Sequence, residues 1–515
     1  MLLGAASYIC GMFIRRNKNR SGSVSIQIIV KSGRKNKVVQ TIGCAFTSAE
    51  EEILLYKART ELERLQGLQY FFVDHDDAVI EGFVDSLSQD SLRIVGAELV
   101  LGRIYDQIGY PTEGELYLFR NLVLCRLVYP GSKLKTIEYF KKHLGLEISV
   151  YSVYRFLDQI QSKYKRTIED ITYSHTRKLL SGKIGVVFYD MTTLYFEASE
   201  EDDFRITGFS KDGKHQQPQI LIGLLVGING YPIGYEVFEG NTSETKTLIP
   251  VLEAFQSRFS IDKPIVIADA ALLSQKNIDA FIEKGYQFIL GGRLKNESDR
   301  TKSQILNMQI KQGVPRELQH QNGRLVITYS EDRARNDLYN REKGLKRLEK
   351  KVRTGRLSKE HINNRGYNKY LKLEGEIAVT IDYQKFASDK VWDGLKGYIT
   401  NTKLTKDQVI SNYGQLWQIE KAFRISKTDL RIRPIYHRLR KRIEAHLCIC
   451  FCAYKVYKEL ERLLLMNNIT LSTEKALNEL NQLQELTYML PKSKTIKSKL
   501  LSPTPNQIRL MKMKL

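Results

Sequence analysis

The sequence predicts an α/β protein whose central domain is built on a mixed sheet, with a helical region before it. Between residues 182 and 292, apolar runs of strand length alternate with segments of helical spacing. Residues 85–180 show mostly helical periodicity. Strand-like pieces surround a charged helical stretch in residues 293–405, which indicates a β-rich insertion before the last helices of the core.

The chain length predicts several domains, because 515 residues are too many for one compact core and two to four domains are expected. Changes in composition and periodicity mark the boundaries. We expect a small basic β-hairpin with a helix in 1–70, a helical region in 71–180, the first part of the central core in 181–292, the β-rich basic insertion in 293–405, the C-terminal helices of the core in 406–466 and a basic tail in 467–515.

The net charge of +22 favours a polyanionic partner, with nucleic acid ahead of an acidic membrane surface. The six cysteines provide no disulfide framework in a chain of this length, which indicates a reducing compartment. No stretch reaches about eighteen apolar residues, and the apolar N-terminal run of about thirteen is too short to span a bilayer. We therefore expect a cytoplasmic protein without a membrane partner.

The N-terminal 180 residues contain two features of interest. Two β-rich runs, 25–30 and 37–42, are separated by a turn, and a helix is expected over 48–65 with Ser48 as its cap. Further on, a helix over 134–144, a turn at Gly145 and a helix over 149–161 are typical of a helix-turn-helix. The second helix offers Tyr151, Ser152, Tyr154 and Arg155 to DNA, although such helix pairs are also common in all-α regions.

The central strands predict a site at one edge of the sheet. The run 184–189 ends in Asp190, and a second strand is expected over 192–197. The strand over 219–228 pairs with 231–238 across the turn Asn229-Gly230. The buried strand 263–268 ends in Asp269. Strand ends in α/β sheets project side chains into a crevice, so Asp190 and Asp269 are candidate functional residues, although either alone is more often a solvated strand end.

A third carboxylate is expected from a helix. In the segment 413–427, Tyr413, Glu420 and Lys427 fall on one helical line, and Arg424 joins that face one turn after Glu420. Three convergent carboxylates repel one another unless cations lie between them, and their hard oxygens select Mg²⁺ or Mn²⁺. Two such ions can activate a water or a 3′-hydroxyl and stabilise the leaving oxygen of a phosphodiester.

Basic residues cluster after this helix and in the insertion. Residues 421–442 hold nine Lys or Arg against one acid, Asp429, with Tyr436 and His437 among them. Residues 341–374 hold twelve Lys or Arg against four Glu. Basic residues mixed with aromatic ones suit contact with phosphates, whereas solvated charged helices are the alternative.

These residues resemble the bacterial insertion-sequence transposases of the DDE class, best over about 183–455. Asp190-Met191-Thr192 matches a D-x-T motif. The segment 269–274 is similar to D-A-G-x-x-S, with Ala271 where glycine is usual. Tyr413, Glu420 and Lys427 match Y-(2)-R-(3)-E-(6)-K in register, with Leu416 in place of the arginine.

The resemblance implies a ribonuclease-H-like catalytic core in a bacterial, nucleoid-associated enzyme. It implies binding of the terminal inverted repeats, cleavage with two Mg²⁺ (or Mn²⁺) ions per site, and joining to target DNA by a homodimer or larger assembly. Asp190, Asp269 and Glu420 are then catalytic and metal-binding. The DNA-binding residues are expected to be Tyr413, Trp417, Arg424, Lys427, Arg431 and Arg433.

The sequence leaves other roles for Trp417 and other classes of protein open. Trp417 suits stacking on a flipped base or a place in the core. A DNA-binding protein descended from a transposase would bind without cutting, and a related metal-dependent nuclease would cut without joining. A glycosidase with paired carboxylates leaves the charge of +22 unexplained.

Overall fold

The chain forms two compact units, residues 1–89 with 488–497 and residues 90–487 with 498–515. Among the helices formed by the described residues, none has both the length and the apolar character needed to cross a bilayer. The computed structural model describes residues 11–19, 22–32, 35–66, 75–197, 200–209, 213, 216–243, 246–259, 263–270, 274–354, 357, 359–363, 366–374 and 378–515.

The first unit is a three-stranded antiparallel sheet with a helix packed on it, one strand more than the predicted hairpin. Its helix α1 (Ser48–Leu65) is capped by Thr47 rather than by the expected Ser48. The Thr47 side chain accepts from the backbone of Glu50, whose carboxylate accepts from the backbone of Thr47 in return. The other elements are β1 (Met12–Lys18), β2 (Val24–Ser32), β3 (Lys35–Ala45) and α2 (His75–Asp85).

The second unit begins with a helical region, as predicted. The helix-turn-helix pair is present as two helices, capped by Ser132 and Ser149, with Gly145 between them at φ +65°. The helices are α3 (Arg103–Ile108), α4 (Leu116–Val128), α5 (Lys133–Tyr139) with a π-helical extension to Leu144, α6 (Val150–Gln159) and α7 (Lys165–Leu179).

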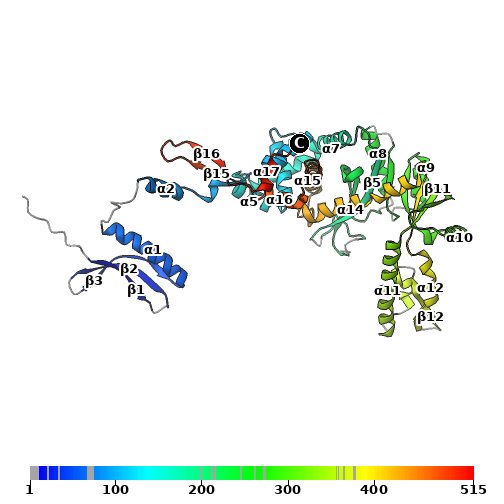
Figure 1. The fold of residues 1–515 in the computed structure, drawn as a ribbon, viewed down its shortest axis with the longest axis horizontal. Coiled ribbons are helices and arrows are strands. Elements are labelled where there is room, and N and C mark those ends of the chain that lie inside the picture. The colour runs from blue at the N-terminus through cyan, green and yellow to red at the C-terminus, as the bar shows by residue number, and fades with distance from the viewer. Residues whose placement is uncertain are drawn as a thin grey trace, which may run out of the picture. The chain divides into compact units, whose positions relative to one another are not determined.

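Eight strands form the central mixed sheet (Figure 1), in the order β10-β11-β14-β9-β8-β5-β6-β7. β5 is parallel to β8 and β8 to β9, and every other neighbouring pair is antiparallel. The strands are β5 (Val186–Tyr195), β6 (Gln219–Val226), β7 (Pro232–Glu239), β8 (Ile265–Ala268), β9 (Phe288–Gly292), β10 (Arg316–His320), β11 (Gly323–Tyr329) and β14 (Leu395–Thr400).

This mixed sheet with helices on both faces confirms the expected α/β core. The β6–β7 connection also matches, with Asn229 and Gly230 both at positive φ. One strand differs. The sequence predicted two strands around Asp190, but β5 runs unbroken to Tyr195, because its second half stays paired with β6 through Tyr195 and Gln219.

Each face of the sheet has its own core. One face packs against α8 (Leu248–Phe259) and α9 (Gln275–Glu283). The other packs against three helices that come later in the chain and against the N-terminal helical region. These three are α13 (Lys406–Gly414), α14 (Trp417–Arg424) and α15 (Arg440–Met466).

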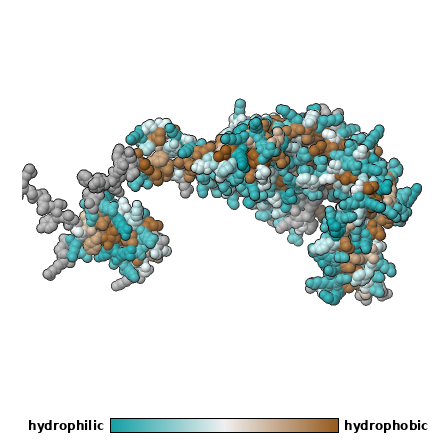
Figure 2. Space-filling view, in the orientation of Figure 1, coloured by the Kyte–Doolittle hydropathy of each residue, from teal (hydrophilic) through white to brown (hydrophobic). Residues whose placement is uncertain are grey.

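The insertion divides between the sheet and a separate lobe. Its strands β10, β11 and β14 extend the central sheet beyond β9. The lobe consists of α11 (Glu331–Arg353), α12 (Tyr383–Ser388) and the hairpin β12–β13, around a small core that includes Leu348 and Tyr370. Its visible face in Figure 2 is hydrophilic at the borders and more apolar along the middle. The hairpin strands are β12 (Leu371–Glu374) and β13 (Ala378–Ile381).

Residues after α15 also form regular elements. Leu477, Leu480 and Leu510 pack into the larger core of the second unit. The expected basic tail thus contributes helices and strands of its own. They are α16 (Thr473–Leu480), β15 (Gln484–Met489), β16 (Ile496–Leu500) and α17 (Pro505–Met511), with β15 paired to β4 (Leu92–Ile94).

Candidate active site

Asp190 lies in the middle of β5, at the point where the neighbouring parallel strand ends. Side chains alternate between the faces of a strand, and Phe188 and Leu194 belong to the core under α14 and α15. Tyr189 and Met191 belong to the opposite core, under α8 and α9. Asp190 therefore lies on the face that α14 covers.

Asp269 lies beside Asp190 on the same face of the sheet. The last parallel pair between the two strands is Tyr189 with Ala268, so the two aspartates are the next residues along neighbouring strands. Ala268 packs in the core under α8 and α9, which directs Asp269 to the other face. The Asp269 side chain is exposed, and its Oδ1 accepts from the backbone nitrogen of Ala270 at 2.6 Å.

Glu420 comes to this face from α14. The helix packs by Ile419 and Phe423, which are buried, whereas Glu420 is exposed. α14 contacts β5, the strand that carries Asp190. Ile419 and Phe423 therefore belong to the packing face of this helix.

The predicted single helix over 413–427 is interrupted. Tyr413 lies in α13 and Glu420 in α14, and Lys427 lies in a π-helical segment over 425–429. Between α13 and α14 the hydrogen bonds tighten, because Leu416 donates to Tyr413 and Gln418 donates to Gln415. Tyr413, Glu420 and Lys427, which were predicted to lie on one face of a single helix, therefore lie in three separate segments.

Tyr413 is buried against the strand next to β8. Its ring lies 4.9 Å, centroid to centroid, from that of Tyr398 on β14. Its hydroxyl occupies the space over Gly291, where a Cβ would come within 2.5 Å of it and within 3.3 Å of the Ala270 Cβ. Burial raises the pKa of Tyr413, and the charges of Asp269 and Glu420 raise it further. Tyr413 thus lies close enough to both acids to be affected by their charges.

Lys396 on β14 is a site residue that sequence reasoning missed. Its Nζ lies 4.6 Å from the ring centroid of Tyr413. Burial lowers the pKa of Lys396, as does the charge of Arg333, whereas the charges of Asp269 and Glu420 oppose that shift. The signal was present in the sequence, because Lys396 is two residues before Tyr398 and so shares its face.

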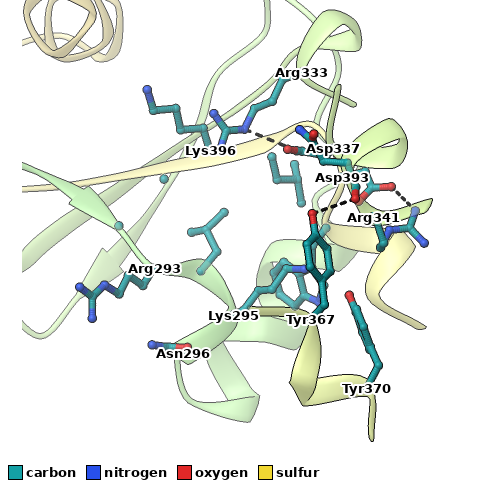
Figure 3. A pocket seen from close by; sticks show the side chains of 16 residues that line it. Arg293, Lys295, Asn296, Arg333, Asp337, Arg341, Tyr367, Tyr370, Asp393 and Lys396 are labelled. Carbon is teal, nitrogen blue, oxygen red and sulfur yellow. Dashed lines mark hydrogen bonds and ion pairs between the residues drawn. The ribbon is translucent and has the colours of Figure 1, made fainter. Parts of the chain in front are cut away.

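A basic cleft of about 420 Å³ adjoins Lys396, between β9, β14 and the α11 lobe. Figure 3 shows Lys396 and Arg333 close together on one side of it. Arg333 Nε lies 3.6 Å from Asp337 Oδ2, and Arg341 pairs with Asp393. The cleft extends the cationic surroundings of the acids into the insertion.

The predicted DNA-binding residues on α14 and in the π-helical segment after it lie in different surroundings. Trp417 is 52% exposed, so the alternative of a core tryptophan is wrong, and Lys421 Nζ lies 5.8 Å from its ring centroid. Arg424 is exposed. Lys427 is half-buried and lines a small pocket with Thr192, two residues after Asp190. The D-x-T segment and Lys427 are thus brought together.

The remaining DNA-binding candidates lie outside α14. Arg431 is exposed and has φ +44°, and the Arg433 guanidinium lies 5.4 Å from the ring centroid of Tyr195 at the end of β5. In the helix-turn-helix pair, Tyr151 and Arg155 are exposed, whereas Tyr154 packs under the guanidinium of Arg442. DNA recognition by these residues stays a prediction.

Register and alternation direct the two aspartates to the sheet face on which α14 packs, but the three acids do not form a closed metal cage. Among the described residues, which include all three, no group of three or more His, Cys, Asp or Glu is placed to hold a metal ion. The negative charges of Asp269 and Glu420 nevertheless both raise the pKa of Tyr413, and both oppose the lowering of the pKa of Lys396. The arrangement is an open set of carboxylates beside cationic residues.

A model of the transposase DDE domain family matches residues 181–455, which is more than half of the chain. No curated protein matches the sequence. Among solved structures, the fold is similar to the piggyBac transposase in a synaptic complex with hairpin DNA, at 10% identity and a TM-score of 0.38, over 75% of this chain and 76% of that one.

Proposed function

Because this chain belongs to the DDE-domain transposases, and is thereby a DNA transposase, we propose that Asp190, Asp269 and Glu420 are its catalytic carboxylates. One observation carries the assignment. Register and alternation direct both aspartates to the sheet face that α14 covers, and the charges of Asp269 and Glu420 both act on Lys396. The three acids lie far apart in sequence, so strand pairing and helix packing, and not local structure, determine how close they come.

The donor set fits Mg²⁺, with Mn²⁺ as the second choice. Three carboxylates supply hard oxygen ligands, and two of them are exposed and able to approach a shared ion. When bound, two such ions activate the attacking oxygen and stabilise the leaving oxygen of a phosphodiester. The side chains of Asp190, Asp269 and Glu420 would hold them.

The chain's own cations position the DNA. Lys396 on β14 is close enough to Asp269 and Glu420 to be affected by their charges, and Arg333 on α11 adds positive charge beside it. Lys427, after α14, lines a pocket with Thr192, two residues after Asp190. Contacts from such residues hold a phosphate in register with the carboxylates. We infer that the substrates are the terminal inverted repeats and a target duplex, joined by a homodimer or larger assembly.

The test is cleavage by the full-length Asp190→Asn variant on a duplex that carries the ends of the element, in Mg²⁺. We expect a loss of at least a hundredfold in the nicking rate with duplex affinity unchanged, because the substitution removes a metal ligand but no DNA contact. Asp299→Asn is the control, since that side chain is fully exposed at the start of helix α10 (Asp299–Asn307). Cleavage at the parental rate by Asp190→Asn would overturn the assignment.

A parent protein that binds the duplex but never cuts it would instead be a DNA-binding protein without catalysis. Cleavage without joining would identify a nuclease. Joined products are therefore measured in the same reactions, by following the transfer of a labelled 3′ end to a second duplex.

A further inference from the structure

A second cleft, of about 510 Å³, lies where the helix-turn-helix pair meets the basic segment after α14. Five cationic residues line it, and none of its lining residues, all in the described part of the chain, is acidic. These five come from the end of α4, the start of α5 and the segment 430–437. They are Arg126, Lys133, Lys135, Arg431 and Arg433.

Two of these cations are buried without an anion. Arg126 and Lys133 are each only 4% exposed. Within the described residues, neither makes an ion pair or a hydrogen bond through its side chain. Removing a charged side chain from most of its water without a partner is unfavourable, so two such cations in one cleft indicate a ligand that supplies the missing charge.

The carboxylate of Asp158, whose charge acts on His437 in the cleft lining, does not supply the missing charge. Asp158 accepts from Arg442 at 2.7 and 2.9 Å and lies 3.3 Å from Lys441. It is therefore already neutralised by residues outside the cleft. Burial, and after it the charge of Arg126, lower the pKa of Lys133 to about 7. The negative charge of an anion in the cleft would oppose this shift.

The cleft is suited to a phosphodiester. A guanidinium and an ammonium group side by side match phosphate oxygens. Its volume exceeds that of a phosphate group alone, and Tyr154, Tyr436 and His437 at its lining offer rings to the adjoining sugars. Arg431 and Arg433 belong to the basic segment that follows Glu420 in sequence, so a ligand here would contact both the helical region and the catalytic core.

We propose that this cleft binds one phosphate of the DNA backbone and so holds the substrate duplex between the helix-turn-helix pair and the catalytic core. The inference rests on the proposed function, because it takes the ligand to be the transposon-end duplex. It adds a defined phosphate site, formed by Arg126 and Lys133, to the general basic surface.

The experiment is a methylphosphonate scan with the full-length chain. Duplexes of the element end, each with one uncharged methylphosphonate, are bound without metal by the parent and by Lys133→Met. We expect one position at which the parent loses about tenfold in affinity, as for a lost charged contact. A methylphosphonate at the same position should leave the duplex affinity of Lys133→Met unchanged. Lys142→Met, an exposed lysine of the same helix pair, should behave as the parent.

The outcomes separate the two proposals. A parent that does not bind the duplex counts against the proposed function. Binding with no Lys133-dependent position overturns the phosphate site alone. Arg126→Gln repeats the scan as a second variant, and its unfolding temperature and that of Lys133→Met show that both remain folded.

Free phosphates are the other source of the same chemistry. Pyrophosphate is added to the parent and to Lys133→Met, and the unfolding temperature is measured. If pyrophosphate raises the unfolding temperature of the parent by a few degrees but not that of Lys133→Met, and the scan also finds a phosphate whose loss weakens binding only in the parent, the cleft is a site for the DNA backbone. If pyrophosphate stabilises only the parent but the scan finds no such phosphate, the cleft binds a free phosphate compound and the DNA proposal is overturned. If an acidic peptide raises the unfolding temperature of the parent but pyrophosphate and the duplex show no dependence on Lys133, the DNA proposal is also overturned.

Discussion

Lys455 shows how strongly one side chain in this core is perturbed. It lies in the middle of α15 with 0% of its surface exposed, and its Nζ donates to Thr176 Oγ1 at 2.8 Å. Burial lowers its pKa to about 7, Glu459 opposes that shift, and Arg462 adds to it. Below pH 7 the folded chain must therefore carry a buried ammonium.

Lys455→Met should stabilise the protein more at pH 6 than at pH 9. The pKa in the folded state lies below that of an unfolded lysine, so the unfolded chain binds more protons between pH 7 and 10.5 and the parent gains stability as the pH rises. The variant lacks this penalty. We expect its unfolding temperature to exceed the parent's by a few degrees at pH 6 and by less at pH 9.

Lys475→Met is the control for this comparison, because Lys475 is exposed on α16. It should shift the unfolding temperature little, and by the same amount at both pH values. A gain for Lys455→Met that is independent of pH would show that packing, and not the buried charge, accounts for it.

At the scale of elements, β9 and α13 approach closely only because residue 291 is a glycine. A Cβ at this position would come within 2.5 Å of the Tyr413 hydroxyl. The position of Tyr413, and with it the start of the segment that carries Glu420, depends on this gap. The close approach of β9 and α13 therefore affects the position of Tyr413 in the candidate site as well as the packing of the core.

Gly291→Ala should lower the unfolding temperature by an amount that corresponds to about 1–3 kcal/mol, as for an overpacked core. Tyr413→Phe removes the clashing oxygen, so the double variant should recover much of that loss. Gly185→Ala is the control, because a Cβ at Gly185 meets no atom within 4 Å. Additive effects of Gly291→Ala and Tyr413→Phe would refute the direct contact.

At the scale of the molecule, the charge of +22 predicts binding to DNA that depends strongly on salt. Duplex affinity measured at several salt concentrations should fall linearly on a double-logarithmic plot. Arg424→Gln, at an exposed phosphate-contact candidate, should reduce the slope by about one. An unchanged slope would remove Arg424 from the DNA interface.

Several central strands of the sheet were predictable from the sequence, because alternation and apolar runs are local signals. These signals located β6, β7 and β8, the turn at Asn229-Gly230 and the three candidate acids. They did not reveal that β5 continues past Asp190, since pairing with β6 decides where that strand ends. The interruption of the predicted helix between α13 and α14 was equally hidden.

The amino-acid order alone predicted the class of core, the candidate acids and the basic segments, since each is encoded in neighbouring residues. Folding in three dimensions placed Lys396 and Arg333 beside those acids and left Arg126 and Lys133 together in one cleft. These groupings join segments far apart in the chain. They depend on which strands pair and which helices pack, and no local pattern encodes that choice.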